Sequence, residues 1–259
     1  MELTEKQFER YRRQISLAEI GQEGQARLAS SKVLLTGVGG LGSAAGLYLA
    51  GAGVGTIGLA DGDVVELVNL HRQVLYTTTD LGKMKVDCGA DRLQSLNPEI
   101  NVAKYPYNLA RDNAAEIVRE YDIVIDTCDN FPTRYLINDV CFFEDQPYVH
   151  GSVYGFEGQV TVFAPGKGPC YRCLYPEPPR LDPSAAPPGL LGMVPGTIGV
   201  IQAAEALKII LGIGTSLIGR ILIVDLLEGG VREVELSRNP DCALCGKNPS
   251  ITDLAAHEG

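Results

Sequence analysis

The sequence predicts an α/β protein of the Rossmann-like, doubly wound type, with a mainly parallel sheet and an added antiparallel portion. Three observations lead to this prediction. Short apolar strands alternate with helical segments over the first 150 residues, four glycines follow the first strand, and the strand-like segments after residue 151 are closely spaced. Such alternation implies parallel strands with helices on both faces of the sheet.

The alternating elements follow an N-terminal arm, residues 4–30, that we expect to be helical. The apolar run after Lys32 is typical of a fully buried strand, and the helix that begins near residue 83 stops at Asn97-Pro98 because proline cannot continue it. The expected elements are a strand at 32–37, a helix at 41–53, a strand at 56–61, a helix at 83–96, a strand at 102–105, a helix at 113–120 and a strand at 122–127.

The pattern changes near residue 151. Segments 159–164, 220–225 and 231–236 are strand-like and lie close enough in sequence to pair in antiparallel fashion. Residues 176–195 are rich in proline and glycine, and a helix is expected at 199–211. A long connection of this kind in a compact domain usually serves as a functional cover.

Composition sets the broad class. The chain has 259 residues, 45% hydrophobic and 21% charged, which is ordinary for a globular protein. Its formal charge of −10 argues against nucleic acid as a partner. The start has no apolar signal region, and we expect no stretch apolar enough to cross a membrane. Seven cysteines without a paired framework indicate a reducing compartment, so we expect a cytoplasmic protein.

Two Cys-x-x-Cys pairs lie in the last third of the chain, Cys170/Cys173 and Cys242/Cys245. Four thiolates in paired spacing favour one tetrahedral zinc site over a redox dithiol. Because four thiolates leave no open position for water, the zinc is expected to be structural.

The glycine turn after the first strand indicates a nucleotide site. Glycines permit a tight turn and bring backbone N–H groups at a helix N-terminus close to phosphate. Asp61 ends the next strand, where an acidic side chain commonly accepts ribose hydroxyls. These features fit NAD and ATP equally, and a tight turn without a ligand is the structural alternative. The glycines concerned are Gly37, Gly39, Gly40 and Gly42.

Nearby cations favour ATP over NAD. Arg72 and Lys85 lie within one connection and one helix of the glycine turn. A triphosphate and its pyrophosphate leaving group require such cations, whereas a dehydrogenase does not. Asp129 follows a strand at the same edge of the sheet and is placed to hold magnesium. His150 is interpreted as a hydrogen-bonding residue and Cys128 as a small buried thiol.

Together these motifs resemble the MoeB/ThiF (HesA/MoeB/ThiF) family of adenylyltransferases, relatives of ubiquitin-activating enzymes. The resemblance runs from about residue 1 to residue 247 and is carried by motifs in the family's order. They are Arg10-Tyr-Arg-Arg-Gln14, the glycine turn, Asp61-x-Asp63, Asn69-Leu-x-Arg-Gln73, Lys85, Asp129-Asn130 and the two Cys-x-x-Cys pairs.

The resemblance implies a homodimer that uses ATP and Mg²⁺ to adenylate the C-terminal glycine of a small ubiquitin-fold sulfur carrier ending in Gly-Gly, such as MoaD or ThiS. Arg13 would reach the partner subunit's site, Arg72 and Lys85 would neutralise phosphate oxygens, and Asp129 would anchor magnesium. Besides the glycines, the residues implied in nucleotide binding are Asp61, Asp63, Asn69, Leu70, His71, Arg72, Gln73, Lys85, Asp129 and Asn130.

The resemblance also implies a domain plan: a single adenylation domain over 1–259, with the arm at 1–30, a nucleotide-binding half at 31–150 and a carrier-binding half at 151–250. The latter would contain the zinc site and a crossover loop at 174–195. Ala185 stands where many members carry a cysteine that links covalently to the carrier, so we expect the reaction to stop at the acyl-adenylate.

No sulfurtransferase segment follows Lys247 in this sequence, so we expect a separate sulfur donor. Two other interpretations remain: an NAD-dependent oxidoreductase, and a non-catalytic scaffold for a ubiquitin-like protein. The sequence does not distinguish molybdopterin from thiamine or another product, nor a native Ala185 from an introduced one.

Overall fold

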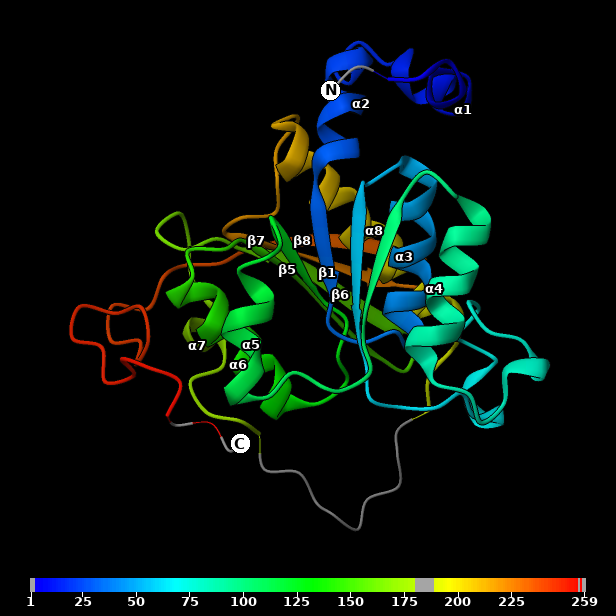
Figure 1. The fold of residues 1–259 in the computed structure, drawn as a ribbon. Coiled ribbons are helices and arrows are strands. Elements are labelled where there is room, and N and C mark those ends of the chain that lie inside the picture. The colour runs from blue at the N-terminus through cyan, green and yellow to red at the C-terminus, as the bar shows by residue number, and fades with distance from the viewer. Residues whose placement is uncertain (1–2, 180–188, 256, 258–259) are drawn as a thin grey trace.

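The computed structural model of the chain describes residues 3–179, 189–255 and 257. Its centre is one eight-stranded sheet in the order β3-β2-β1-β4-β5-β6-β7-β8 (Figure 1). The strands are β1 (Lys32–Leu35), β2 (Thr56–Ala60), β3 (Asn101–Tyr105), β4 (Ile123–Asp126), β5 (Tyr148–Tyr154), β6 (Glu157–Phe163), β7 (Arg220–Asp225) and β8 (Gly230–Glu235).

The direction of the strands divides the sheet. Strands β1 to β5 pair in parallel, whereas β5 to β8 pair in antiparallel fashion. The change comes at the turn between β5 and β6, close to residue 151 where the sequence pattern changes. The predicted fold class, a Rossmann-like parallel sheet with an antiparallel portion, is confirmed.

Helices cover both faces of the sheet (Figure 1). Val33 and Leu35 of β1 pack in one core cluster, and Leu34 between them packs in the other. A strand buried on both sides needs a continuous apolar run, which explains the sequence of β1. The helices are α1 (Glu5–Ile15), α2 (Gly21–Ser30), α3 (Gly40–Ala52), α4 (Lys85–Leu96), α5 (Arg111–Val118), α6 (Phe131–Phe143), α7 (Tyr171–Leu174) and α8 (Met193–Leu211), with 3₁₀ turns at Leu67–Asn69 and Thr78–Asp80.

The helices differ from the sequence-based prediction in four places, the short helix α7 among them, which was not predicted. The arm is two helices, because the chain turns at Gly21, whose φ of +57° is in the left-handed region. Helix α6 was not predicted, although Asn130 caps it by accepting a hydrogen bond from the Thr133 N–H at 2.9 Å. Helix α8 begins at Met193, six residues before the predicted start at 199.

The expectation that no stretch is apolar enough to span a bilayer was wrong for α8, which meets that test by length and composition alone. In this fold α8 packs against α3 and against β5. Its Ile198 and Ala206 lie in the core, and its buried Gln202 donates to the backbone carbonyls of Asp126 and Val149. These contacts make α8 a core helix.

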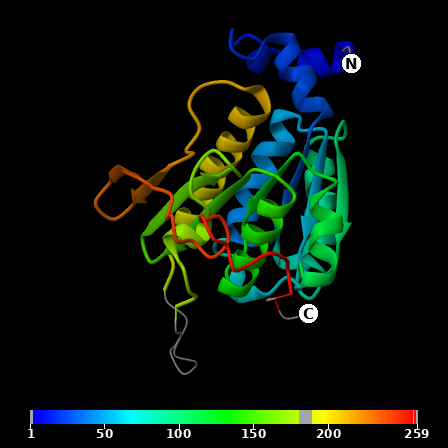
Figure 2. The same cartoon turned by 90° about the vertical axis from the view of Figure 1, so that its left-hand side faces the viewer.

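The N-terminal arm lies at the end of the sheet opposite the C-terminal ends of the parallel strands (Figures 1 and 2). The Tyr11 hydroxyl accepts a 2.7 Å hydrogen bond from Asn97, the residue that ends α4, and Tyr11 also packs on Gly53, which ends α3. Helix α3 therefore separates the arm from the glycine turn at its other end by about 20 Å, the length of a 13-residue helix.

Candidate active site

A cavity of about 520 Å³ opens at the C-terminal edge of the parallel strands. The loops after β1, β2 and β4 form it, and residues 189–195 close one side. This is the edge at which doubly wound sheets bind their ligands. Ten predicted site residues line the cavity: Gly37, Gly39, Gly40, Asp61, Asp63, Arg72, Gln73, Lys85, Asp129 and Asn130.

The glycine turn is packed more tightly than any side chain allows. Gly37 has a φ of +142°, and a Cβ there would lie 2.9 Å from the Thr127 carbonyl oxygen. A Cβ on Gly42 would lie 2.1 Å from the Gly37 carbonyl oxygen. Gly42 therefore supports the turn from beneath and does not line the cavity, contrary to the direct contact predicted for it.

Lys85 and two aspartates, buried Asp61 and exposed Asp63, form a charged group on the cavity wall. The Lys85 ammonium lies 2.7 Å from a carboxylate oxygen of Asp63 and 3.9 Å from one of Asp61, and its side chain is 6% exposed. Asp61 also accepts hydrogen bonds from the Val38 and Asp63 N–H groups at 2.7 and 2.8 Å. Burial raises the pKa of Asp61, and Lys85 opposes that rise.

Arg72 is held at the cavity by its own segment. Its guanidinium donates a 2.7 Å hydrogen bond to the side-chain oxygen of Asn69 and a 3.3 Å bond to the Val68 carbonyl. Asn69 thus orients Arg72 and does not line the cavity itself. Leu70 and His71 do not line it either, because Leu70 packs on the core and the His71 Nδ1 contacts the Val68 carbonyl at 2.9 Å.

Asp129 and Asn130 lie at the mouth of the cavity, and both are exposed. Within the part of the chain that the structure describes, Asp129 makes no ion pair. Its carboxylate is therefore available to a cation, which fits the predicted magnesium ligand. The side-chain oxygen of Asn130 caps α6, and its amide nitrogen can donate hydrogen bonds to a ligand.

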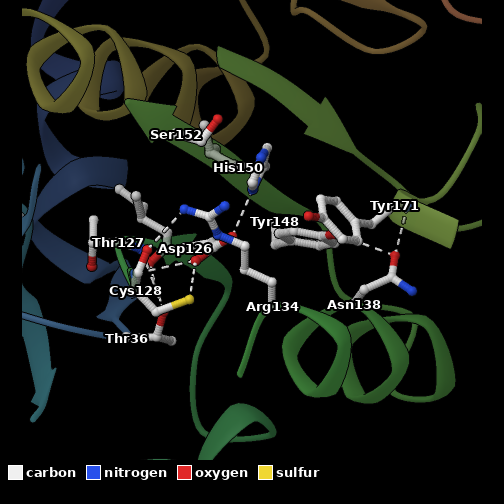
Figure 3. A network of polar contacts seen from close by, with 12 residues as sticks. Thr36, Asp126, Thr127, Cys128, Arg134, Asn138, Tyr148, His150, Ser152 and Tyr171 are labelled. Carbon is white, nitrogen blue, oxygen red and sulfur yellow. Dashed lines mark hydrogen bonds and ion pairs between the residues drawn. The ribbon is translucent and has the colours of Figure 1, made fainter. Parts of the chain in front are cut away.

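A buried polar network behind the cavity was missed at the level of sequence (Figure 3). The Asp126 carboxylate lies 2.6 Å from the His150 Nδ1 and accepts hydrogen bonds from the N–H and thiol of Cys128. Burial lowers the pKa of His150. Burial alone would raise the pKa of Asp126, but His150, Arg134 and Cys128 together outweigh burial and the pKa is lowered. Arg134 of α6 lies beside this pair and donates to the Cys128 carbonyl at 3.2 Å.

A groove of about 410 Å³ adjoins the cavity along β5 and β6. Aromatic rings of Phe131, Tyr171 and Tyr175 line it, and the His150 side chain reaches it from the network. Three residues line both the groove and the cavity: Arg134, Val153 and Tyr154. The two spaces therefore meet at these side chains. The sequence signal that could have identified Arg134 is the helix start at Asn130-Phe-Pro132, which places Arg134 in the first turn of α6.

The four paired cysteines converge at the far side of α6. Their sulfur atoms all lie within 4.8 Å of one another, with 3.8 Å between Cys170 and Cys173, 3.5 Å between Cys170 and Cys242, and 3.3 Å between Cys173 and Cys245. A tetrahedral zinc with Zn–S bonds of about 2.3 Å holds its sulfurs about 3.8 Å apart. The cluster is therefore compatible with zinc.

Two further residues named in the sequence analysis are Arg13 and Ala185. Arg13 is exposed on α1, at the opposite end of the sheet from the cavity of its own chain. Ala185 lies outside the described residues.

Known proteins resemble this chain in sequence and in fold. The ThiF family matches residues 11–244. The chain belongs to the ThiF family. The sulfur carrier protein adenylyltransferase of Thermus thermophilus is 47% identical over 100% of this chain and 98% of its own length. The adenylyltransferase and sulfurtransferase MOCS3 of Culex quinquefasciatus is 47% identical over 99% of this chain, which spans 59% of that protein.

The fold agrees with a solved ThiF-like structure. E. coli MccB with ATP superimposes with a TM-score of 0.77 and 28% identity, over 86% of this chain and 68% of MccB. Membership of the ThiF family confirms the resemblance found in the sequence. The expected class of enzyme, an adenylyltransferase, is confirmed by the names of relatives that match over the whole chain.

Proposed function

We propose that this ThiF-family protein transfers AMP from ATP to the C-terminal glycine of a small ubiquitin-fold sulfur carrier ending in Gly-Gly. One observation carries the proposal. Two cations, Arg72 and Lys85, and an exposed carboxylate, Asp129, surround a glycine turn in one cavity that opens into an aromatic groove. The cavity suits a magnesium nucleotide and the groove suits an extended peptide tail. The name of the Thermus relative supports a sulfur carrier as substrate, and the name of the Culex relative supports adenylyl transfer.

The nucleotide would place its phosphates on the N–H groups that begin α3, where the helix N-terminus favours negative charge. Asp61 would accept the ribose hydroxyls, as acidic residues at the end of the second strand commonly do. The fold shared with E. coli MccB, which was solved with ATP, supports ATP as the nucleotide. The cavity favours ATP over NAD because Arg72 and Lys85 lie where a triphosphate needs counter-charge.

The reaction requires positioning and charge neutralisation. A carboxylate oxygen of the carrier's terminal glycine attacks the α-phosphorus in line. The bond from that phosphorus to the oxygen bridging the α- and β-phosphates breaks, and its electron pair leaves with pyrophosphate. No proton is transferred, so no protein base is needed. Arg72 and Lys85 neutralise the phosphate oxygens.

Magnesium would bind Asp129, whose exposed carboxylate faces the cavity without an ion pair in the described part of the chain. It would supply further neutralisation of phosphate charge. Zinc would bind the four cysteines, tying the segment around residue 170 to the segment around residue 242. With four sulfur ligands it would take no part in the chemistry.

The active assembly would be a two-fold dimer. Arg13 lies on α1, and the arm is separated from the glycine turn by α3, a helix about 20 Å long, so we expect Arg13 to reach an active site in a second copy. Leu67, Val68 and Met193 beside the Arg72 segment are 69%, 70% and 67% exposed. A second copy packed on this apolar surface would bring its Arg13 to the phosphates.

The product would remain a carrier–AMP anhydride. The pKa values of Cys88, Cys128 and Cys141 are all raised, mainly by burial, which keeps the thiols protonated and unreactive. Cys128 and Cys141 are buried as expected, whereas Cys88 is only partly buried. We further propose a separate sulfur donor and a cytoplasmic location.

The test is intact-mass analysis of candidate carriers after incubation with the protein, ATP and Mg²⁺. The expected result is a carrier heavier by one AMP, with no covalent carrier–enzyme adduct on non-reducing electrophoresis. Carriers lacking the terminal glycine are the control and should stay unmodified. Tight binding of NAD with no modification of any Gly-Gly carrier would overturn the proposal.

A further inference from the structure

Arg134 is the one charged residue among the three side chains that line both the nucleotide cavity and the aromatic groove. The reaction brings two anions together at this junction, because a carboxylate must approach an α-phosphate. Their repulsion is strong in a site from which water is excluded. A cation that contacts both groups reduces the repulsion, and a residue at the junction can reach both spaces.

The guanidinium has hydrogen-bonding capacity to spare. It donates one hydrogen bond to the Cys128 carbonyl, has the Tyr171 hydroxyl beside it, and its Nε has no partner among the described residues. An arginine carries five N–H donors in a planar fork that matches carboxylate and phosphate oxygens. Arg134 therefore has donors free for two anionic ligands at once.

The Asp126–His150 pair lies behind Arg134 and is buried, with side chains 1% and 2% exposed. A carboxylate so deeply buried is stable only when it is paired and hydrogen-bonded. His150 and Cys128 satisfy the Asp126 oxygens, and its negative charge attracts Arg134. The pair thereby holds the guanidinium at the back of the junction without competing for its outer donors.

We propose that Arg134 is a further catalytic residue, which binds the carrier's terminal carboxylate and the α-phosphate together, and that Asp126 and His150 are positioning residues for it. This inference rests on the proposed adenylation of a carrier. The bonds that form and break are those already given. Arg134 donates hydrogen bonds to both anions throughout and keeps its protons.

The first experiment compares wild type with Arg134→Gln and Arg134→Lys, using ATP, Mg²⁺ and a Gly-Gly carrier that wild type adenylates. Arg134→Gln should lower kcat by about 10²–10³-fold, the usual cost of removing one donor from a developing charge. Its ATP affinity should stay near wild type, because Arg72 and Lys85 hold the triphosphate. Arg134→Lys, which keeps the charge, should recover part of the rate. Arg119→Gln, which removes an exposed arginine paired with Glu144, is the matched control and should leave kcat unchanged.

A double-mutant cycle tests the positioning role. If Asp126 acts through Arg134, Asp126→Asn should lower kcat in the wild type but not further in the Arg134→Gln background. His150→Gln replaces Asp126→Asn if that variant does not fold. Full activity of folded Arg134→Gln, or additive losses in the cycle, would overturn the inference while wild-type adenylation still stands. Failure of wild type to adenylate any carrier would instead overturn the proposed function.

Discussion

Gly42→Ala tests the physical basis of the nucleotide site, because it changes a residue that touches no ligand. A Cβ at Gly42 would lie 2.1 Å from the Gly37 carbonyl oxygen, whereas ordinary contact begins at 3.4 Å. Both groups belong to the backbone of the glycine turn and the first turn of α3. The turn must therefore move by about 1 Å, and a displacement of that size costs roughly 100-fold in rate when it misplaces reacting groups.

The same clash lowers stability by about 1–3 kcal/mol, the usual cost of overpacking. The assay is ATP–pyrophosphate exchange with a carrier, alongside thermal unfolding. We expect the rate of exchange to fall about 100-fold at a temperature where the variant is fully folded. Both the affinity for ATP and kcat should decrease. The carrier's own affinity in the groove should change little.

Gly51→Ala is the matched control, since Gly51 lies in the same helix and a Cβ there meets nothing within 4 Å. Alanine favours a helix over glycine by up to about 1 kcal/mol, so this variant should be at least as stable as wild type and fully active. Wild-type exchange by Gly42→Ala would refute the reasoning, because the turn would then tolerate a side chain that the packing excludes.

Three further predictions concern the zinc cluster, the dimer and pH. Cys173→Ser should lower zinc content and melting temperature together, because the metal closes the loop from residue 173 to residue 242; a zinc-free variant of unchanged stability would contradict this. A mixture of Arg13→Ala and Lys85→Ala should regain activity, because one of the two sites in each mixed dimer is intact. If subunit exchange is demonstrated and the mixture is no more active than either variant alone, a shared site is ruled out. Burial lowers the pKa of His150 below 6.5, so the stabilising contribution of neutral His150 is complete above pH 6.5 and is lost as the pH falls. In His150→Asn the melting temperature should therefore fall less steeply with decreasing pH, whereas His71→Asn should behave as wild type. Equal slopes for wild type and His150→Asn would refute this prediction.

The sequence predicted those strands and helices whose signal lies within a short segment of the chain. The alternating strands and helices of the first 127 residues and the antiparallel segments after residue 151 were found because periodicity and length decide them. Helix α6 was missed because its start, Asn130 and Pro132, overlaps the Asp129-Asn130 motif, which was interpreted only as part of the nucleotide site. The break at Gly21 was missed because only the fold shows that the chain needs a left-handed residue there.

The residues of the candidate site also divide into those that short motifs predicted and those that only the fold brings together. Motifs gave the residues that face the cavity, such as Arg72 and Lys85, because they follow the glycine turn in the order of motifs that the resemblance uses. The Asp126–His150–Arg134 network joins three separate elements, and no short motif records that contact. Asn69 and Gly42 were predicted to contact the ligand, but Asn69 orients Arg72 and Gly42 makes room for the turn.

Carrier-dependent exchange of labelled pyrophosphate into ATP tests the central claim most directly, because only reversible formation of the acyl-adenylate produces it. With Mg²⁺ and a ubiquitin-fold carrier ending in Gly-Gly, we expect exchange that disappears when the carrier's last glycine is deleted, and that Lys85→Met abolishes. Exchange that proceeds equally without any carrier, or none with a broad panel of Gly-Gly carriers, would contradict the account.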